Sequence, residues 1–356
     1  MVGSVKSGRA VVLALVVCLV LGGATLALLG RHQSTRDARP ASSGVSPHAA
    51  SSPATSPAPA PSTPVPLAST PAGDKALSSS VIARQAELRR LAKQAQALSS
   101  KRRNVRPVAD FTIANFNIQG ASHRGGISGR TSRVRTLLES YGVDVVALQE
   151  FQPPQRGIFS RIAGGTFEVF PGAAGRSLDA ENSVAWRRAT FELVRAETRS
   201  YRYFRGATRN MPRVLLRHRR TGVTVWVTSY HNPATCCGYG NSAGFRAQDV
   251  RAQAADANAL VAATKTPLIV SGDMNDRASY FCGMAGGTGM HSADGGVVSG
   301  GCRPPRHAWI DWILGTPNVE FSGYLRDGSR FVRATSDHPI VVTRVKVTGK
   351  PGEGRH

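Results

Sequence analysis

The sequence is short of acidic side chains. Only 22 of its 356 residues are Asp or Glu, whereas 45 are Lys or Arg, and the formal net charge is +23. Residues 107–346 alone hold 29 basic and 18 acidic residues, so the excess is not confined to one terminus. A basic protein of this kind attracts polyanions, and arginine contacts to phosphates give binding that depends on salt and tolerates sequence.

Cysteine is also scarce, and its spacing does not suit zinc. There are five cysteines and no C-x-x-C pair, so we do not expect a structural zinc site. Cys18 lies in an apolar run; the other four fall in the folded part, where an exported protein forms disulfides. Adjacent cysteines pair poorly, so we expect either that Cys236 and Cys237 bond to the other two, or that Cys282 and Cys302 form a single bridge with the vicinal thiols unassigned.

Only one long apolar run is present. Residues 10–30 carry no charge, and about 20 such residues suffice for a helix to span a bilayer. The run is longer than the apolar region of a cleaved signal peptide, about 7 to 15 residues. We therefore expect residues 1–32 to anchor the chain in the cell membrane by a single pass, with the folded part outside; a cleaved signal and secretion are the alternative. Positive charges flank both ends of the run, so orientation is not fixed.

Bulky side chains are missing from the next segment. Residues 33–80 are mostly Ser, Pro, Ala and Thr, which cannot offset the entropy lost on ordering and predict a disordered, extended linker. Residues 81–106 contain neither Gly nor Pro and predict an exposed helical spacer. We expect residues 348–356 to form a flexible tail. No protein partner is inferable from the chain, and we expect a monomer.

Residues 107–347 alternate between strand-like and helix-like patterns and predict one α/β or α+β domain with packed layers. The expected helices are 132–142 and 244–264. The expected strands are 111–118, 143–150, 182–188, 191–197, 223–231, 267–273, 307–314 and 338–347.

Acids, amides and histidines recur where these strands end. Taken singly, each has an ordinary explanation as a turn, a cap or a solvated side chain. Together they indicate a polar cleft able to hold a metal, because strands of layered sheets expose their ends on a common rim. The residues are Asn117, Glu150, His231, Asn232, Asp273, Asn275, Asp311, Asp337 and His338.

Seven motifs, in this order and spacing, resemble the endonuclease/exonuclease/phosphatase superfamily, which includes DNase I-like nucleases, sphingomyelinases and inositol-phosphate phosphatases. They are "FNIQG", "VDVVALQE", "NSVAWRR", "TSYHNP", "LIVSGDMND", "AWIDWIL" and "TSDHP". The resemblance spans about residues 108–347. It implies a four-layered sandwich of two mixed β-sheets flanked by helices, and a metal-dependent phosphodiesterase.

The resemblance also implies a metal site. Glu150 matches the family's metal-binding glutamate, Asn117 its partner asparagine, and Asp337 a residue close to the metal. Hard oxygen ligands of this kind suit Mg²⁺ or Mn²⁺ better than zinc. Gln119 stands where some members carry Asp, which bears on a second metal rather than on the first.

The remaining matches imply catalytic roles. Asp273 matches the aspartate that orients or deprotonates the attacking water, and Asn275 the amide that holds the phosphate. His338 matches the essential histidine, and Asp311 the carboxylate that orients it and raises its pKa. His231 matches a histidine at the scissile phosphate or leaving group. Asn182 and Arg246 are further substrate-binding candidates.

The substrate class stays open between several alternatives. Eleven arginines lie between residues 187 and 220, and Tyr201, Tyr203 and Phe204 interleave with them, which favours a nucleic acid held in a basic, aromatic-lined groove. The rings could instead belong to the core. A sphingomyelinase-like or inositol-phosphate phosphoesterase is the alternative within the superfamily, and a non-catalytic, surface-tethered DNA-binding protein is the alternative outside it. A lipid enzyme needs an apolar loop for entering membranes; only residues 280–296 offer one, and their glycines favour a flexible loop near the mouth of the site.

Overall fold

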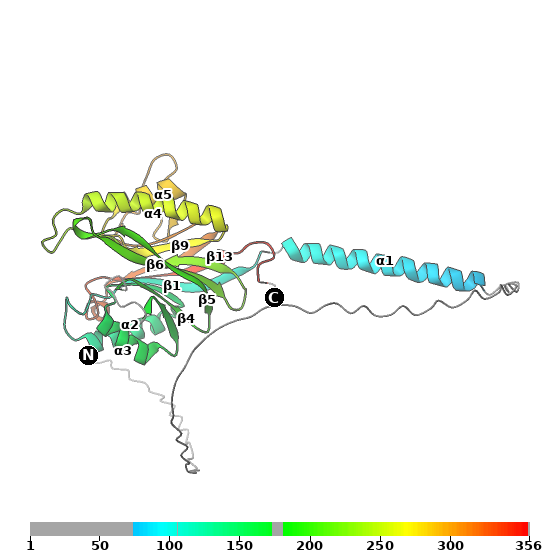
Figure 1. The fold of residues 1–356 in the computed structure, drawn as a ribbon, viewed down its shortest axis with the longest axis horizontal. Coiled ribbons are helices and arrows are strands. Elements are labelled where there is room, and N and C mark those ends of the chain that lie inside the picture. Colours follow the sequence, from blue (N-terminus) through cyan, green and yellow to red (C-terminus); the bar gives the residue numbers. More distant parts are fainter. Residues whose placement is uncertain (1–73, 105, 173–180, 355–356) are drawn as a thin grey trace, which may run out of the picture. The chain divides into compact units, whose positions relative to one another are not determined.

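Two β-sheets packed face to face form the centre of the folded part (Figure 1). The computed structural model describes residues 74–104, 106–172 and 181–354. The first sheet consists, in spatial order, of β12 (Val319–Asp327), β13 (Ile340–Thr348), β1 (Val108–Asn117), β2 (Val145–Gln149), β4 (Ser183–Arg187) and β3 (Phe167–Phe170). The second consists of β10 (His291–Ser292), β11 (Asp311–Gly315), β9 (Leu268–Asp273), β7 (Thr224–Thr228), β6 (Thr208–His218) and β5 (Phe191–Arg202), with β8 (Tyr230–His231) paired to β9.

Both sheets are mixed, as the sequence predicts. In the first, β1 runs parallel to β2 and antiparallel to β13; in the second, β9 runs parallel to β7 and antiparallel to β11. Every residue of β2 and of β9 is buried. These strands are apolar without alternation because both of their faces are covered.

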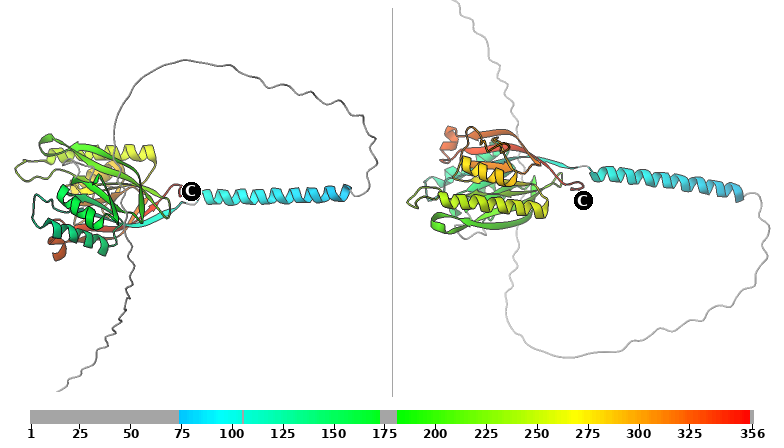
Figure 2. Two further views of the ribbon diagram at one scale, coloured as in Figure 1. Left: turned by 60° about the horizontal axis from the view of Figure 1, so that its bottom comes forward. Right: turned by 90° about the horizontal axis from the view of Figure 1, so that it is seen from above.

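Four helices cover the outer faces of the sheets (Figure 2). They are α2 (Ile127–Ser140) and α3 (Pro153–Ala163) on the first sheet, and α4 (Ala243–Thr264) and α5 (Ala278–Thr288) on the second. One apolar cluster fills the space between the sheets, and one lies beneath each helix pair. Among the described residues this gives four layers, an α/β arrangement in which each sheet buries both faces.

Several elements differ from the sequence prediction. The strand expected at 307–314 begins only at Asp311, and the strand expected at 223–231 is interrupted after Thr228. β3, β6, β12 and α3 were not predicted, nor were three short elements, β10, η3 (Phe204–Gly206) and α6 (Arg330–Arg333). β6 contains Pro212 and four charged or amide side chains, which local patterning does not favour in a strand; tertiary pairing with β5 and β7 overrides that preference.

The segment expected to be a flexible loop, residues 280–296, instead begins inside α5. Tyr280, Phe281 and Met284 share one buried face of this helix. Gly283 is needed there because a Cβ at its position would lie 2.4 Å from Cγ1 of Val250 on α4. These glycines therefore allow two helices to approach closely, rather than giving a loop its freedom, and no residue of α5 lines the candidate site described below.

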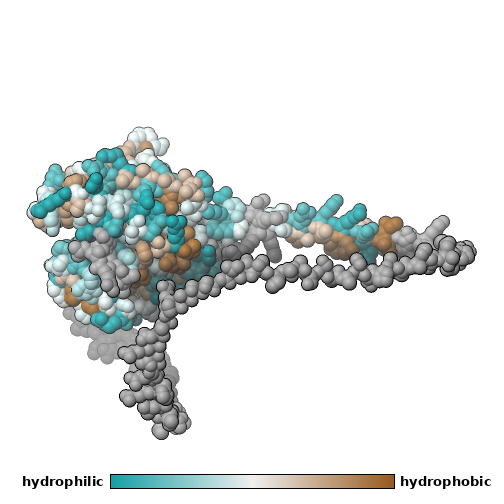
Figure 3. Space-filling model, in the orientation of Figure 1, coloured by the Kyte–Doolittle hydropathy of each residue, from teal (hydrophilic) through white to brown (hydrophobic). Residues whose placement is uncertain are grey.

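The segments outside the sandwich also depart from expectation. Helix α1 spans Asp74–Asn104, so it begins inside the segment expected to be linker, after Gly73, where no Gly or Pro interrupts it. Its larger apolar side chains are exposed and gather along one side (Figure 3).

The segment after β13 is held by hydrogen bonds. Lys350 Nζ donates to the carbonyl of Thr264, and Thr224 N–H donates to Glu353 Oε1. Residues 349–353 are thus tied to the second sheet and are not a free tail.

No helix among the residues described above is long and apolar enough to cross a membrane. The expected anchor at 1–32 and most of the expected linker lie outside those residues, so both remain expectations.

The four cysteines among the described residues form two disulfide bonds. Cys282 joins Cys302, as one of the alternatives has it. The other two cysteines join each other as a vicinal disulfide, Cys236–Cys237, contrary to our expectation that neighbours would pair poorly. Cys237 has a left-handed backbone, with φ of 64°, and this local conformation accommodates the bond between adjacent residues.

Asp249 on α4 gives a prediction about stability. Its carboxylate is buried, one oxygen accepts the N–H of Arg202, and the other has no partner. Burial raises its pKa from 3.8 to about 7. The folded state then binds a proton that the unfolded state has released, so stability falls as the pH rises from about 4 to 7. Asp249→Asn should stabilise the protein at pH 8, by about 2 to 4 kcal/mol, and much less at pH 4.

Asp256 on the same helix is the matched control. Its carboxylate forms an ion pair with Arg199 at 2.5 Å. Burial by itself would raise the pKa of Asp256, but the hydrogen bond from Arg199 outweighs burial and lowers that pKa. The stability it contributes is present above its unfolded pKa and is lost as the pH falls, so Asp256→Asn should destabilise at pH 8. Urea unfolding at both pH values measures both variants, and equal effects of the same sign would contradict the prediction.

Candidate active site

The predicted acids and amides meet at one end of the two sheets. Asn117, at the end of β1, is paired in register with Gln149 at the end of β2, and Glu150 follows directly. Across the sandwich, Asp273 at the end of β9 is paired with His231 on β8 and with Asp311 on β11. The parallel pairs β1–β2 and β8–β9 bring strand ends from both sheets to a common rim, as expected for an α/β site.

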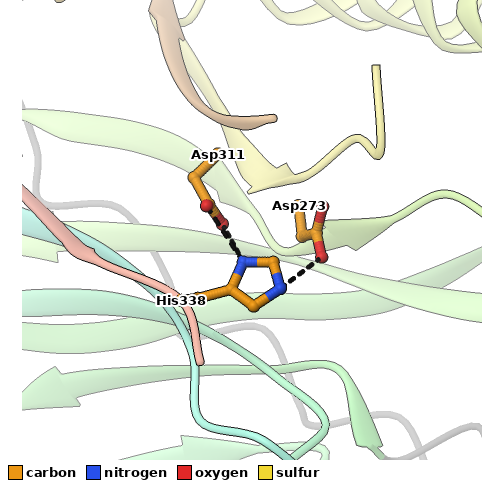
Figure 4. Close-up of side chains that lie close together, drawn as sticks. All are labelled: Asp273, Asp311 and His338. Atoms are coloured by element: carbon orange, nitrogen blue, oxygen red, sulfur yellow. Dashed lines mark hydrogen bonds and ion pairs between the residues drawn. The ribbon is translucent and has the colours of Figure 1, made fainter. Parts of the chain in front are cut away.

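His338 lies between two buried carboxylates (Figure 4). Its Nδ1 is 3.0 Å from Asp311 Oδ2, and its Nε2 is 3.7 Å from Asp273 Oδ2. Burial alone would lower the pKa of His338, but Asp311 and Asp273 outweigh it and raise the pKa to about 10. The imidazole is therefore a cation at neutral pH in this arrangement.

A buried polar network holds Asp311 in place. Asn115 Nδ2 donates to Asp311 Oδ1 at 3.3 Å, while Asn115 Oδ1 accepts from Gln149 Nε2 and from Ser271 Oγ. These side chains come from both sheets and face the gap between them. The network fixes the orientation of Asp311 and, through it, of the His338 ring. Sequence reasoning did not single out Asn115 or Gln149, which look like ordinary strand residues.

Asp273 is surrounded by donors and imidazoles. It accepts hydrogen bonds from Asn117 Nδ2 at 3.1 Å and from the backbone N–H of Asn275 at 3.0 Å. His231 Nε2 lies 3.5 Å from Asp273 Oδ2. Burial raises the pKa of Asp273, and His338 and His231 act against that change. Burial is the largest influence on His231 as well, and it lowers the pKa of this imidazole.

The two histidines are therefore held in different protonation states. His338 is a cation beside two carboxylates, whereas burial favours neutral His231. In an active site, acid and base roles fall to neighbouring groups whose environments push their pKa values apart.

Glu150 is held from two sides. Asn117 Nδ2 donates to its Oε1 at 3.0 Å, and the N–H of Gly120 donates to its Oε2 at 2.8 Å. His123 Nε2 lies 3.5 Å from the same Oε2. Burial by itself would raise the pKa of Glu150, but His231 and these donors lower it overall, so the group is a carboxylate at neutral pH.

The carboxylates fit a hard divalent cation. Glu150, Asp273 and Asp337 line the same cavity, and each offers oxygen donors of the kind that Mg²⁺ and Mn²⁺ prefer. Asp273, Asp311 and His338 also lie close enough to share an ion, with donor atoms within 4.8 Å of one another. A cation held by this second group would displace existing contacts, because both nitrogens of His338 face carboxylates and Asp311 accepts a hydrogen bond from Asn115.

Left-handed backbone conformations gather at this cavity. Gln119, Glu150, Cys237 and Asn275 line it and have φ between 48° and 64°. Each such residue costs about 1 to 3 kcal/mol and persists only where the surrounding structure fixes it. Local sequence did not predict these conformations, which aim the side chains of Glu150 and Asn275 at the strand ends.

The cavity has a volume of about 740 Å³. A larger hollow of about 890 Å³ lies beside α3 and β3, but the described residues that line it bring no carboxylates and imidazole together. The smaller cavity holds six of the predicted site residues. Its lining residues include Glu150, His231, Asp273, Asn275, Asp337 and His338.

Four predicted residues do not line the cavity. Asn117 and Asp311 lie directly behind it, in contact with Glu150 and His338. Asn182 is fully buried and its amide has no hydrogen-bond partner. Arg246 on α4 donates to the carbonyl of Pro233 at 2.8 Å and so braces the loop after β8.

Sequence reasoning missed a pair next to Asn182. Glu181 and Arg209 both line the cavity and form an ion pair at 3.2 Å. The available signal was the position of Glu181, which is an acid directly before the candidate Asn182 in a sequence with few acids.

The charge of the arginine-rich strands is partly neutralised, by six acids of this chain. Eight of the eleven arginines between residues 187 and 220 form ion pairs with acids of this chain, most of them along β5 and β6. Tyr201 is a core residue, whereas Tyr203 and Phe204 line the cavity. Among the described residues, Arg202, Arg205 and Arg220 form no ion pair, whereas Arg209, which lines the cavity, is paired with Glu181. The expected basic groove along these strands is therefore partly neutralised by acids of the same domain.

Comparisons with known proteins place the fold. A search of curated sequences gives no significant match. Among solved structures, an endonuclease/exonuclease/phosphatase from Bacteroides vulgatus aligns with a TM-score of 0.52 at 16% identity, over 67% of this chain and 99% of that one. A D. rerio TDP2 humanized by 14 mutations aligns with a TM-score of 0.51 at 18% identity, over 66% and 98%.

A protein of the same family from Bacteroides thetaiotaomicron aligns with a TM-score of 0.51 at 13% identity, over 67% of this chain and 98% of that one. At these identities the likeness shows the fold. The sequence itself matches the profile described as Endonuclease/Exonuclease/phosphatase family over residues 114–338, which is more than half of the chain and contains every strand-end residue discussed above. The chain therefore belongs to the Endonuclease/Exonuclease/phosphatase family.

Proposed function

We propose that the protein is a Mg²⁺- or Mn²⁺-dependent phosphodiester hydrolase that acts on nucleic acid. The observation that supports this most is the His338 imidazole held between Asp311 and Asp273 in a cavity that Glu150 and Asp337 also line. A cationic donor, an anionic acceptor and a carboxylate pair fit hydrolysis of a phosphodiester, in which negative charge grows on the phosphate oxygens.

Each residue then has a chemical role. Asp273, held by Asn117 and the Asn275 N–H, orients the attacking water and accepts its proton. His338, kept cationic by Asp311, stabilises the charge on the phosphate. A divalent cation held by Glu150 and Asp337, when bound, would neutralise charge on a non-bridging oxygen. Neutral His231 faces the phosphate or the leaving group.

Two observations favour nucleic acid over a lipid head group. The segment considered for membrane entry forms α5, where Met284 is buried; Met290, just after it, is buried as well. In addition, Arg209 and three aromatic side chains line the cavity, which suits a polyanion carrying flat rings. We further propose that the domain is exported and either tethered by the N-terminal segment or secreted; the two disulfides support an oxidising compartment.

A substrate panel tests this proposal. The full-length protein, purified in detergent, is incubated with single- and double-stranded DNA, RNA, sphingomyelin and inositol phosphates in Mg²⁺ and in Mn²⁺. We expect cleavage of nucleic acid, absent in His338→Ala. Release of phosphocholine without nucleic acid cleavage would establish the lipid alternative, and tight DNA binding without any hydrolysis would establish the non-catalytic alternative.

Metal dependence is tested on Glu150. EDTA should abolish activity, and added Mg²⁺ should restore it. Glu150→Gln keeps the side-chain size but removes the charge, so the Mg²⁺ concentration for half-maximal activity should rise by at least about tenfold. Glu139→Gln is the control, because Glu139 forms an exposed ion pair with Arg135. This variant should require the same Mg²⁺ concentration for half-maximal activity as wild type. Activity that persists in EDTA would refute the metal requirement.

A further inference from the structure

Part of the cavity wall has no role in the mechanism above. It consists of Tyr203, Phe204 and Tyr239 together with the vicinal disulfide of Cys236 and Cys237, and we name it the aromatic–sulfur wall. It comes from two segments, η3 with its flank and the loop after β8. Tyr203 is only 6% exposed whereas Tyr239 is 43% exposed, so the wall runs from a buried ring to one that faces solvent.

The rings form a continuous row that begins at a catalytic side chain. Tyr203 lies edge-on to His231, with ring centroids 6.0 Å apart, and edge-on to Phe204 at 4.5 Å. Phe204 in turn stacks on Tyr239, with centroids 4.2 Å apart and planes 15° from parallel. The wall therefore extends from the reacting centre outward, where a group attached to the scissile phosphate would lie.

The vicinal disulfide fixes the local shape of this wall. It closes the first two residues of a turn in which Tyr239 N–H donates to the carbonyl of Cys236 at 3.2 Å. Because a bond between adjacent residues closes almost no loop, it adds little to global stability. Its effect is local: it restricts the turn that carries Tyr239 beside Phe204.

The charges on the wall select the kind of ligand. The Arg209 guanidinium lies 3.9 Å from the centroid of the Tyr203 ring, and that of Arg205 lies 5.3 Å from Tyr239. Cations are thus already placed against these rings, so a quaternary ammonium head group is disfavoured. A flat, uncharged ring joined to a phosphate fits better, since aromatic side chains and arginine together bind single-stranded nucleic acid.

We propose that the aromatic–sulfur wall is a nucleobase subsite that holds one base next to the scissile phosphodiester. The inference rests on the proposed function, because it presumes that nucleic acid is the substrate. Tyr203, Phe204 and Tyr239 supply the stacking surface, and the Cys236–Cys237 bond keeps that surface assembled.

The test uses the full-length protein and three short single-stranded oligonucleotides with one cleavable phosphodiester. One carries all its bases; the others lack the base on one or the other side of the cleavable bond. We expect removal of one of these bases to raise KM about tenfold, within the range for stacking of one base, and removal of the other to have little effect.

Variants then show which residues cause the difference in KM between the oligonucleotides. Tyr239→Ala should reduce the tenfold ratio to less than about twofold, and Tyr239→Phe, which keeps the ring, should preserve it. Cys236→Ser/Cys237→Ser should reduce it to about threefold. Cys282→Ser/Cys302→Ser, which removes the disulfide away from the wall, is the matched control and should leave the ratio unchanged. Phe204→Leu is a second wall variant in case Tyr239→Ala fails to fold.

The outcomes separate the subsite from the function. Cleavage of all three oligonucleotides with equal KM, or a tenfold ratio that survives in both Tyr239→Ala and Phe204→Leu, overturns the subsite and leaves the hydrolase proposal standing. If bis(p-nitrophenyl) phosphate is hydrolysed but no oligonucleotide is cut, the nucleic acid assignment fails and the subsite fails with it.

Discussion

Replacing His338 with Ala is expected to lower kcat/KM for a phosphodiester by about a thousandfold or more, within the range for removing a positioned acid or base. That corresponds to about 4 kcal/mol of transition-state stabilisation. The expectation rests on the position of the ring between Asp311 and Asp273, where it carries a positive charge close to the developing negative charge of the phosphate.

Single-turnover kinetics and thermal unfolding should be measured together. His307→Ala is the control, since His307 is exposed and does not line the cavity. It should keep activity within about twofold. A folded His338→Ala protein within about tenfold of wild type, a difference below ~1.4 kcal/mol, would remove His338 from the mechanism.

Asp273→Asn is expected to be at least as damaging to kcat. The substitution preserves the shape of the side chain and lets it still accept the Asn275 N–H, but it removes the negative charge that accepts the proton of water. A loss of about a thousandfold in kcat, with KM changed little, is therefore expected.

The stability of the same variant should change much less than its activity. Burial raises the pKa of Asp273, so a neutral isostere removes a charge that burial disfavours, but it also removes the acceptor of Asn117 Nδ2 and one of the two carboxylates beside His338. These effects oppose each other, so we expect the melting temperature to stay close to that of wild type. Asp276→Asn is the matched control: this half-buried carboxylate does not line the cavity and accepts the N–H of the next residue. Lost activity with a markedly lower melting temperature would point to a structural rather than catalytic role.

Much of the site could be predicted because its chemistry lies at strand ends. Glu150, His231, Asp273 and His338 follow or begin short apolar runs, and parallel pairing places such ends on one rim whatever the details of the loops. The residue types and their order along the chain were therefore enough to bring them together.

The remainder of the site depends on tertiary packing. Arg246 matched a plausible pattern, yet the path of α4 directs its guanidinium to Pro233 and away from the cavity. Glu181 and Tyr239 contribute to the cavity only because β6 and the loop after β8 fold back beside β4, and no local pattern records that approach.

The elements of the fold likewise divide into those that local sequence predicts and those that depend on tertiary packing. The two central apolar strands, β2 and β9, were predicted from composition alone because both faces are buried. β6 was missed because its polar residues pair across strands, and α5 was mistaken for a loop because its glycines serve helix contact.

The direction of β1 determines how the enzyme can be attached to anything else. The strand begins at Val108, next to residue 349, whose N–H donates to the Pro107 carbonyl, and it ends nine residues later at Asn117, behind the cavity. At about 3.3 Å per residue, roughly 30 Å separate the point of attachment from the reacting groups. A tether, a surface or a fused protein joined ahead of residue 107 therefore meets the domain at the end remote from the cavity, whose mouth stays accessible to a long polymer.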